Sequence, residues 1–207
     1  GDVYKRQVLG VTCVAGNVPL DLTSVNALKI CELSGVFSVP VFRGSLAPLK
    51  RKLITAEHVH GKTGLDGTDL LVKKKELEPT DAVDFIIECT EKYRDEKITI
   101  CALGPLTNIA KVLKKDTVLT ESIEEIVLMG GGFFEGGNIT PAAEFNIYVD
   151  PEAAKIVLES GLKITMLPLD VTHKTLVQRN FLEKLRKSGK NSAIQAAKLL
   201  DFFERYD

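Results

Sequence analysis

Two hydrophobic periods alternate along the chain. Short runs of apolar and β-branched residues predict buried strands, and these runs are residues 8–15, 39–42, 98–103, 126–129 and 163–167. Apolar residues at helical spacing predict helices between and after them, at residues 20–33, 81–93, 104–113, 151–161 and, as two helices, 179–205. Buried strands that alternate with amphipathic helices predict an α/β fold with an open, mostly parallel, Rossmann-like sheet and helices on both faces. In such folds ligands bind beyond the carboxyl ends of the strands.

Residues 43–78 are long, punctuated by glycine and poorly periodic, and a loop of this kind is often functional. It contains His58 and His60, which would share a face in an extended chain. A zinc pair lacks a third ligand nearby, so a solvated histidine and a substrate-contacting histidine on a mobile loop are the main alternatives. Residues 56–63 (AEHVHGKT) approach the phosphate-binding loop pattern, but the first glycine and the following helix are missing.

Composition excludes several classes of partner. The 207 residues carry 27 Lys and Arg against 28 Asp and Glu, so the basic excess typical of nucleic-acid binding is missing. No apolar run approaches the roughly 20 residues of a membrane span. The cysteines Cys13, Cys31, Cys89 and Cys101 form no CxxC pair and lie in apolar stretches, which predicts reduced core thiols in a cytoplasmic protein.

The segment from 127 to 150 (VLMGGGFFEGGNITPAAEFNIYVD) contains the richest candidate chemistry. A predicted strand runs into three glycines, and Asn138, Glu144 and Asn146 follow. In an extended chain Glu144 and Asn146 would point one way and Phe145 toward the core. Such amides and carboxylates can bind several sugar hydroxyls at once. The alternative is a glycine-rich loop in which the same side chains satisfy backbone groups.

Six ordered blocks resemble the nucleoside hydrolase family of the inosine-uridine preferring type. They are VTCVAGN (11–17), HVHGKTGLDG (58–67), ALGPLTNIA (102–110), VLMGGG (127–132), GNITPAAEFNIYVDPEAA (137–154) and PLDVTH (168–173). The resemblance implies hydrolysis of the N-glycosidic bond of ribonucleosides to ribose and free base, in nucleoside salvage. It also implies a bound calcium ion, a ribonucleoside as the partner and a homodimer or homotetramer for the full-length protein.

The resemblance assigns substrate contacts to residues from several parts of the chain. Asn138 and Glu144 match residues that bind the 5′ side of the sugar, and Asn146 matches an asparagine near the ring and its lower hydroxyls. Met129 matches a methionine that lines the pocket beside the ribose. One extra glycine in EGGN is expected to shift the Asn138 loop slightly.

Three further positions complete the implied pocket. Asn17 matches an asparagine at the ribose and calcium end, and His60 matches a histidine on the flexible loop that covers the base. Leu103 occupies the position whose main-chain carbonyl binds calcium; the family often has threonine there, but a carbonyl ligand does not depend on the side chain.

The catalytic aspartate is missing from this sequence. The family supplies its base and calcium ligands from an N-terminal DxDxxxDD cluster and a late His-Asp pair, and neither occurs in the 207 residues. We therefore expect residues 1–207 to form one incomplete nucleoside hydrolase domain that is inactive by itself, with residues 1–7 as a candidate non-native segment. The loss of a central strand would leave unpaired sheet edges. The alternative from another functional class is a nucleoside- or sugar-binding module without catalysis.

Overall fold

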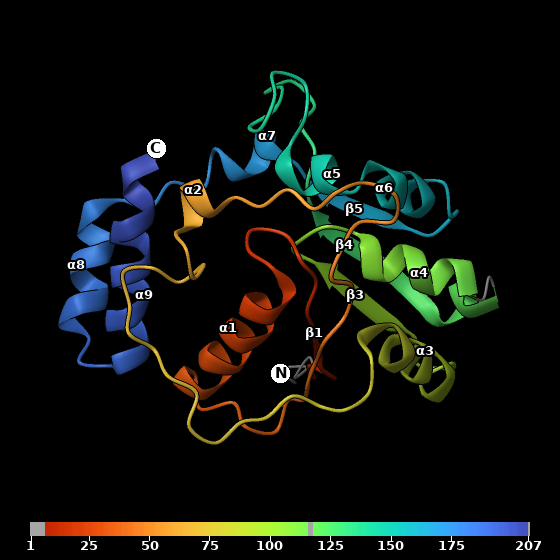
Figure 1. The fold of residues 1–207 in the computed structure, drawn as a ribbon, viewed down its shortest axis with the longest axis horizontal. Coiled ribbons are helices and arrows are strands. Elements are labelled where there is room, and N and C mark those ends of the chain that lie inside the picture. The colour runs from red at the N-terminus through yellow and green to blue at the C-terminus, as the bar shows by residue number, and fades with distance from the viewer. Residues whose placement is uncertain (1–6, 116–117, 207) are drawn as a thin grey trace, which may run out of the picture.

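The computed structural model describes residues 7–115 and 118–206. Figure 1 shows the secondary structure, which in chain order is β1 (Val11–Thr12), α1 (Leu20–Leu33), β2 (Val41–Phe42), α2 (Glu57–His60), α3 (Ala82–Lys92), β3 (Ile98–Ala102), α4 (Thr107–Lys115), η1 (Val118–Ser122), β4 (Ile123–Met129), α5 (Phe145–Val149), α6 (Pro151–Leu158), β5 (Ile164–Leu167), α7 (Leu169–Thr172), α8 (Arg179–Lys187), α9 (Asn191–Phe203) and η2 (Glu204–Tyr206).

All paired strands run parallel, as the sequence predicted. β1 pairs with β2, and β3, β4 and β5 form a second sheet in that order. Among the described residues the strands thus divide into two sheets rather than one, and β1 and β3 do not pair with each other. The α/β class is confirmed, and the carboxyl ends of β3, β4 and β5 lie along one edge because their directions agree.

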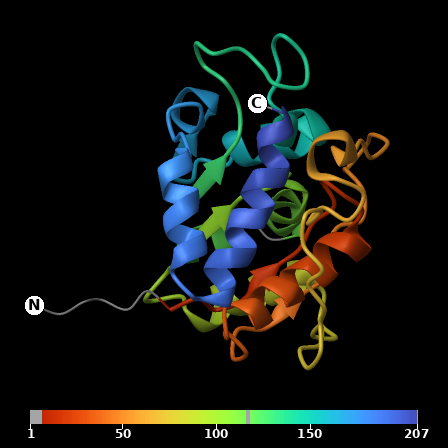
Figure 2. The ribbon, with the colours of Figure 1, turned by 90° about the vertical axis from the view of Figure 1, so that its left-hand side faces the viewer.

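The main core surrounds β4. Ile126 and Leu128 are fully buried against α4 and α6, which also contact each other. A smaller core joins β1 and β2 to α1. α8 and α9 pack side by side as a helical pair at one side of the molecule (Figures 1 and 2). Over the described residues, no helix combines the length and the apolar character that a membrane span requires.

The longer elements match the sequence prediction closely, and the differences are local. The predicted strand at 8–15 pairs only at Val11–Thr12. The helix predicted at 81–93 begins one residue later, because Asp81 caps α3 by accepting the Val83 N–H at 2.8 Å. The short helices α2, α5 and α7 were not predicted, because four or five residues are too few to establish a helical period. The interpretation of residues 1–7 as non-native falls, apart from Gln7, outside the described residues.

The prediction that β3 is buried throughout was wrong. Thr99 and Cys101 are exposed, whereas Ile98 and Ile100 contact the core, so only one face of this strand is covered by described residues. All four cysteines are free, but only Cys13 and Cys89 are buried core thiols. Burial raises the pKa of both buried thiols.

These differences predict the order of alkylation by iodoacetamide. Cys101 should react first in the native protein, while Cys13 and Cys89 react slowly because they are inaccessible and form the thiolate less readily. Peptide mass spectrometry over a time course measures the order, and urea-unfolded protein provides the control in which the differences should disappear. Native labelling of Cys13 or Cys89 as fast as Cys101 would contradict the structure.

Candidate functional site

Ala56 connects two of the expected site residues. Its N–H donates to the Asn17 carbonyl at 2.9 Å, and its own carbonyl accepts the His60 N–H at 2.9 Å. Ala56 is 4% exposed, so these bonds are sheltered from water. The end of β1 and the start of α2 are thereby held together, with the Asn17 side chain exposed beside them.

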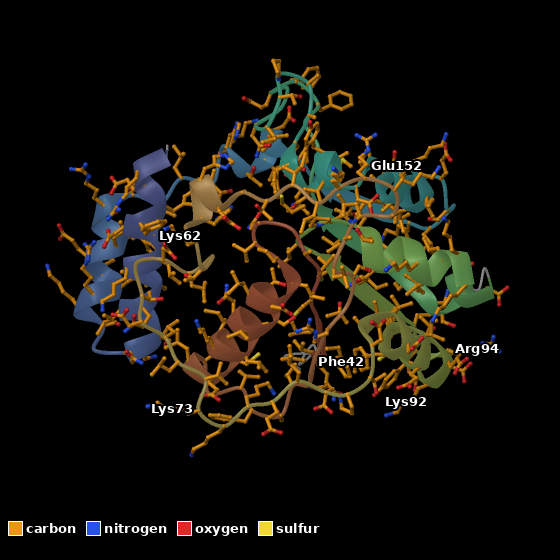
Figure 3. The ribbon with its side chains drawn as sticks, in the orientation of Figure 1. Phe42, Lys62, Lys73, Lys92, Arg94 and Glu152 are labelled. Atoms are coloured by element: carbon orange, nitrogen blue, oxygen red, sulfur yellow. The ribbon has the colours of Figure 1, made fainter. Side chains whose placement is uncertain are left out.

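The loop after α2 is anchored at both sides. Asn26 on α1 donates to the Thr63 carbonyl at 2.7 Å, and Asp66 accepts from the Thr63 N–H and hydroxyl. Gly67 approaches α9 so closely that an added Cβ would lie 3.0 Å from the Lys198 carbonyl. Figure 3 shows Lys62 on this same loop. The expected covering loop therefore rests on α1 and α9 in this structure.

His58 and His60 do not share a face. They lie in a helical turn rather than an extended chain, and residues two apart on a helix point to nearly opposite sides. His58 is exposed, whereas the half-buried His60 ring stacks on Phe203 with centroids 5.7 Å apart. Burial, with a smaller effect of His58, lowers the pKa of His60. His60 is thus favoured in its neutral form.

Asn146 lies against the end of β4. Its Nδ2 donates to the Met129 carbonyl at 3.1 Å and lies 3.3 Å from the Met129 sulfur. Asn146 is 8% exposed. Two of the residues that the resemblance assigns to the ribose, Met129 and Asn146, are therefore in direct contact, although they are 17 positions apart in the chain.

Glu144 and Asn138 satisfy backbone groups of the same region. Glu144 caps α5: one carboxylate oxygen accepts the Ile147 N–H at 3.2 Å and the Gly131 N–H at 3.0 Å. Asn138 accepts the Phe145 N–H at 2.8 Å. The expected extended conformation of residues 144–146 was wrong, because α5 begins immediately after Glu144. Glu144 is only 3% exposed, so the loop-stabilising alternative describes much of what this side chain does here.

Phe145 brings the two groups of residues together. Its ring is buried in one apolar cluster with Ala56 and Val149, with Val59 of α2 packed against it. Ala56 is bonded to the Asn17 and His60 backbones, while Glu144 and Asn146 flank Phe145. The sequence predicted that Phe145 points toward the core, which its burial confirms, but it gave no indication that Phe145 packs with Ala56.

Leu103 follows β3 directly. Its neighbour Ala102 pairs with Leu128, so the Leu103 backbone lies next to the end of β4 and Met129. Its side chain is 81% exposed. No group of three or more His, Cys, Asp or Glu side chains that could hold a metal ion occurs among residues 7–115 and 118–206. A Leu103 carbonyl by itself does not make a calcium site, which takes 6–8 oxygen ligands.

Sequence reasoning missed Asp170. Its carboxylate accepts the N–H groups of Phe133 and Phe134 at 2.7 and 2.8 Å, and these bonds lower its pKa. The loop from Gly131 to Gly137, which joins Met129 to Asn138, is therefore fixed at its outer end by α7. The PLDVTH block contained Asp170, but nothing in the sequence indicated that its partners are backbone amides 36 and 37 residues away.

Glu144 should stabilise the fold through both of its backbone bonds. We expect Glu144→Ala to lower the free energy of unfolding by about 1–3 kcal/mol, because two partly buried N–H groups lose their acceptor. Glu144→Gln should lose less, since the amide oxygen can still accept both. Urea unfolding measures the difference, and a wild-type midpoint for Glu144→Ala would refute the capping role.

His60 should make stability depend on pH. The folded state resists protonation of this ring, so the unfolded state binds more protons as the pH falls below the ordinary value of 6.5. Wild type should therefore lose stability below about pH 6.5 relative to His60→Phe. Unfolding curves at pH 7.5 and pH 5.5 test this, with His58→Phe as the exposed control. Parallel pH profiles for wild type and His60→Phe would contradict the burial of this ring.

Comparison with known proteins identifies the family. The inosine-uridine preferring nucleoside hydrolase family matches residues 3–207. A pyrimidine-specific ribonucleoside hydrolase, RihA of Photobacterium profundum, is 48% identical over 202 residues, which are 98% of this chain and 64% of the relative. The chain thus spans less than two thirds of that protein.

Solved structures agree with this assignment. A purine-preferring ribonucleoside hydrolase from Gardnerella vaginalis superposes with a TM-score of 0.91 and 32% identity, covering 96% of this chain and 64% of that one. The plant nucleoside hydrolase PpNRh1 gives 0.91 and 34%, covering 97% and 63%. Because the family match extends over nearly the whole sequence and the fold agrees closely, the chain belongs to the inosine-uridine preferring nucleoside hydrolases.

Proposed function

We propose that the whole protein hydrolyses the N-glycosidic bond of ribonucleosides to ribose and free base, and that these 207 residues form the sugar-binding part of its active site. The observation that carries the proposal is the junction at Ala56. Its backbone binds those of Asn17 and His60, and its side chain packs with Phe145 between Glu144 and Asn146. Ala56 and Phe145 thus connect chain segments that the sequence separates by up to 129 positions, which supports one shared pocket.

The residue types suit this chemistry. Cleavage of an N-glycosidic bond passes through a sugar with oxocarbenium character, and oxygen atoms held near the ring stabilise its positive charge. Asn146 is held by the Met129 backbone, so its amide is oriented before the substrate arrives. A bound calcium ion would supply a hard cation for the sugar hydroxyls and a water molecule, and the Leu103 carbonyl is the ligand that this chain would contribute. Calcium coordination, like the general base, would require carboxylates beyond those that the described residues offer here.

We further propose that pyrimidine ribonucleosides are the preferred substrates. Support comes from the degree of likeness: the pyrimidine-specific RihA is 48% identical, while the purine-preferring enzyme from Gardnerella vaginalis is 32% identical. Comparison of kcat/KM for uridine and inosine tests this preference, and a higher value for inosine would overturn it.

A test of the proposed hydrolase activity compares two forms of the protein. The product of the whole coding region should release ribose from uridine in the presence of calcium, whereas the 207-residue chain should release little or none. In the longer form, Asn146→Ala should lower kcat/KM by about 10²–10³-fold, which is typical for loss of a group that stabilises transition-state charge. Asn191→Ala, on the exposed surface of α9, is the matched control and should retain wild-type activity.

The outcomes separate the two functional classes. Rapid hydrolysis by the 207-residue chain would refute the need for carboxylates outside it. Binding of uridine by the longer form without any turnover would replace the hydrolase by a nucleoside-binding module. Calorimetric titration with uridine distinguishes binding from turnover when combined with a reducing-sugar assay for ribose.

A further inference from the structure

A buried carboxylate outside the assigned pocket joins three segments. Asp150 is fully buried, and its Oδ2 accepts the Thr107 hydroxyl at 2.7 Å and the Leu49 N–H at 2.9 Å. Its Oδ1 accepts the Ala153 N–H at 3.0 Å, which caps α6. Thr107 is 1% exposed, so both partners of the side-chain bond are removed from water. Buried polar pairs of this kind impose a single geometry, because any shift leaves a polar group without a partner.

Asn108, which follows Thr107, makes a second set of buried hydrogen bonds between distant segments. Asn108 is 4% exposed; its Nδ2 donates to the Cys13 carbonyl at 2.9 Å, and its Oδ1 accepts the Ser45 N–H at 2.8 Å. The fit is close, since a Cβ added at Gly44 would lie 2.5 Å from the Asn108 amide nitrogen. The start of α4 therefore fixes the end of β1 as well as the start of α6.

Each anchored point lies close in the chain to an assigned site residue. Thr107 is four residues after Leu103, Asp150 is four residues after Asn146, and Cys13 is four residues before Asn17. None of the anchors belongs to the assigned pocket. The Thr107–Asp150 bond thus spans the two short segments that carry the Leu103 carbonyl and the Asn146 amide.

We propose that Thr107 and Asp150 are positioning residues for nucleoside binding and hydrolysis. Their hydrogen bond sets the position of the Asn146 segment relative to the turn after β3, and so the spacing of the groups that face the sugar. The inference rests on the proposed function. Its physical basis is that a displacement of about 1 Å at a reacting centre can lower the rate by about 10²-fold.

The test compares two buried threonines in the longer, active form of the protein. Thr107→Val removes the hydroxyl that binds Asp150 and keeps the shape of the side chain. Thr90→Val is the matched control: Thr90 is also fully buried, but its hydroxyl binds the Ile87 carbonyl within α3. Both variants should lower the urea midpoint, whereas only Thr107→Val should lower kcat/KM for uridine, by about tenfold or more. Thr107→Ser, which restores the hydroxyl, should recover most of that loss.

Hydrogen exchange supplies a readout that does not depend on turnover. In Thr107→Val, the Leu49 amide and the amides of α5 should exchange faster than in wild type by about tenfold, because Asp150 is held less firmly. In Thr90→Val these amides should be unchanged. If wild type hydrolyses no nucleoside, the proposed function fails. Hydrogen exchange alone then decides whether the Thr107–Asp150 bond positions the Asn146 segment. The inference is overturned if Thr107→Val keeps the wild-type exchange of α5, or if both valine variants lower kcat/KM equally.

Discussion

The parallel pairing of β3, β4 and β5 is the constraint on which the candidate site depends. Because the strands run in one direction and in the register Ala102 with Leu128 and Met129 with Leu167, their carboxyl ends align at one edge. The turns that leave this edge carry the Leu103 carbonyl, the Met129–Asn146 contact and the N–H groups that donate to the Asp170 carboxylate. A different register would move each of these groups to another level of the sheet, since every residue along a strand adds about 3.3 Å.

Side chains that accept hydrogen bonds from backbone N–H groups make the carboxyl edge of β3, β4 and β5 rigid. Glu144, Asn138 and Asp170 together accept five N–H groups from the loop between β4 and α5 and from the first turn of that helix. The loop needs glycine where two stretches of its backbone approach closely, because a Cβ at Gly132 would lie 1.8 Å from the Gly136 carbonyl oxygen. The loop-stabilising and sugar-binding interpretations of these polar residues are therefore compatible. A site that is organised before the substrate arrives avoids the cost of ordering it during the reaction.

The sequence predicted the parts of this arrangement that depend on periodicity. The helix at 20–33 was located to the residue, and the start of α6 at Pro151 was correct, because these signals are local. The conformation of 144–146 and the burial of β3 were wrong for physical reasons: α5 is too short to show a period, and β3 is covered on one face only. Asp170, Thr107 and Ala56 could not be recognised, since their partners are distant in the chain and are mostly backbone groups. The ordered motif blocks supplied the family assignment that periodicity could not.

We expect ribose to bind where the ends of β1, β3 and β4 meet. A crystal structure of the longer protein soaked with ribose tests it most directly. Density for the sugar should then lie within hydrogen-bonding distance of the Asn146 side chain, between the Asn17 turn and the Leu103 backbone. Ordered ribose at another surface, with this edge filled by side chains of the protein itself, would contradict it.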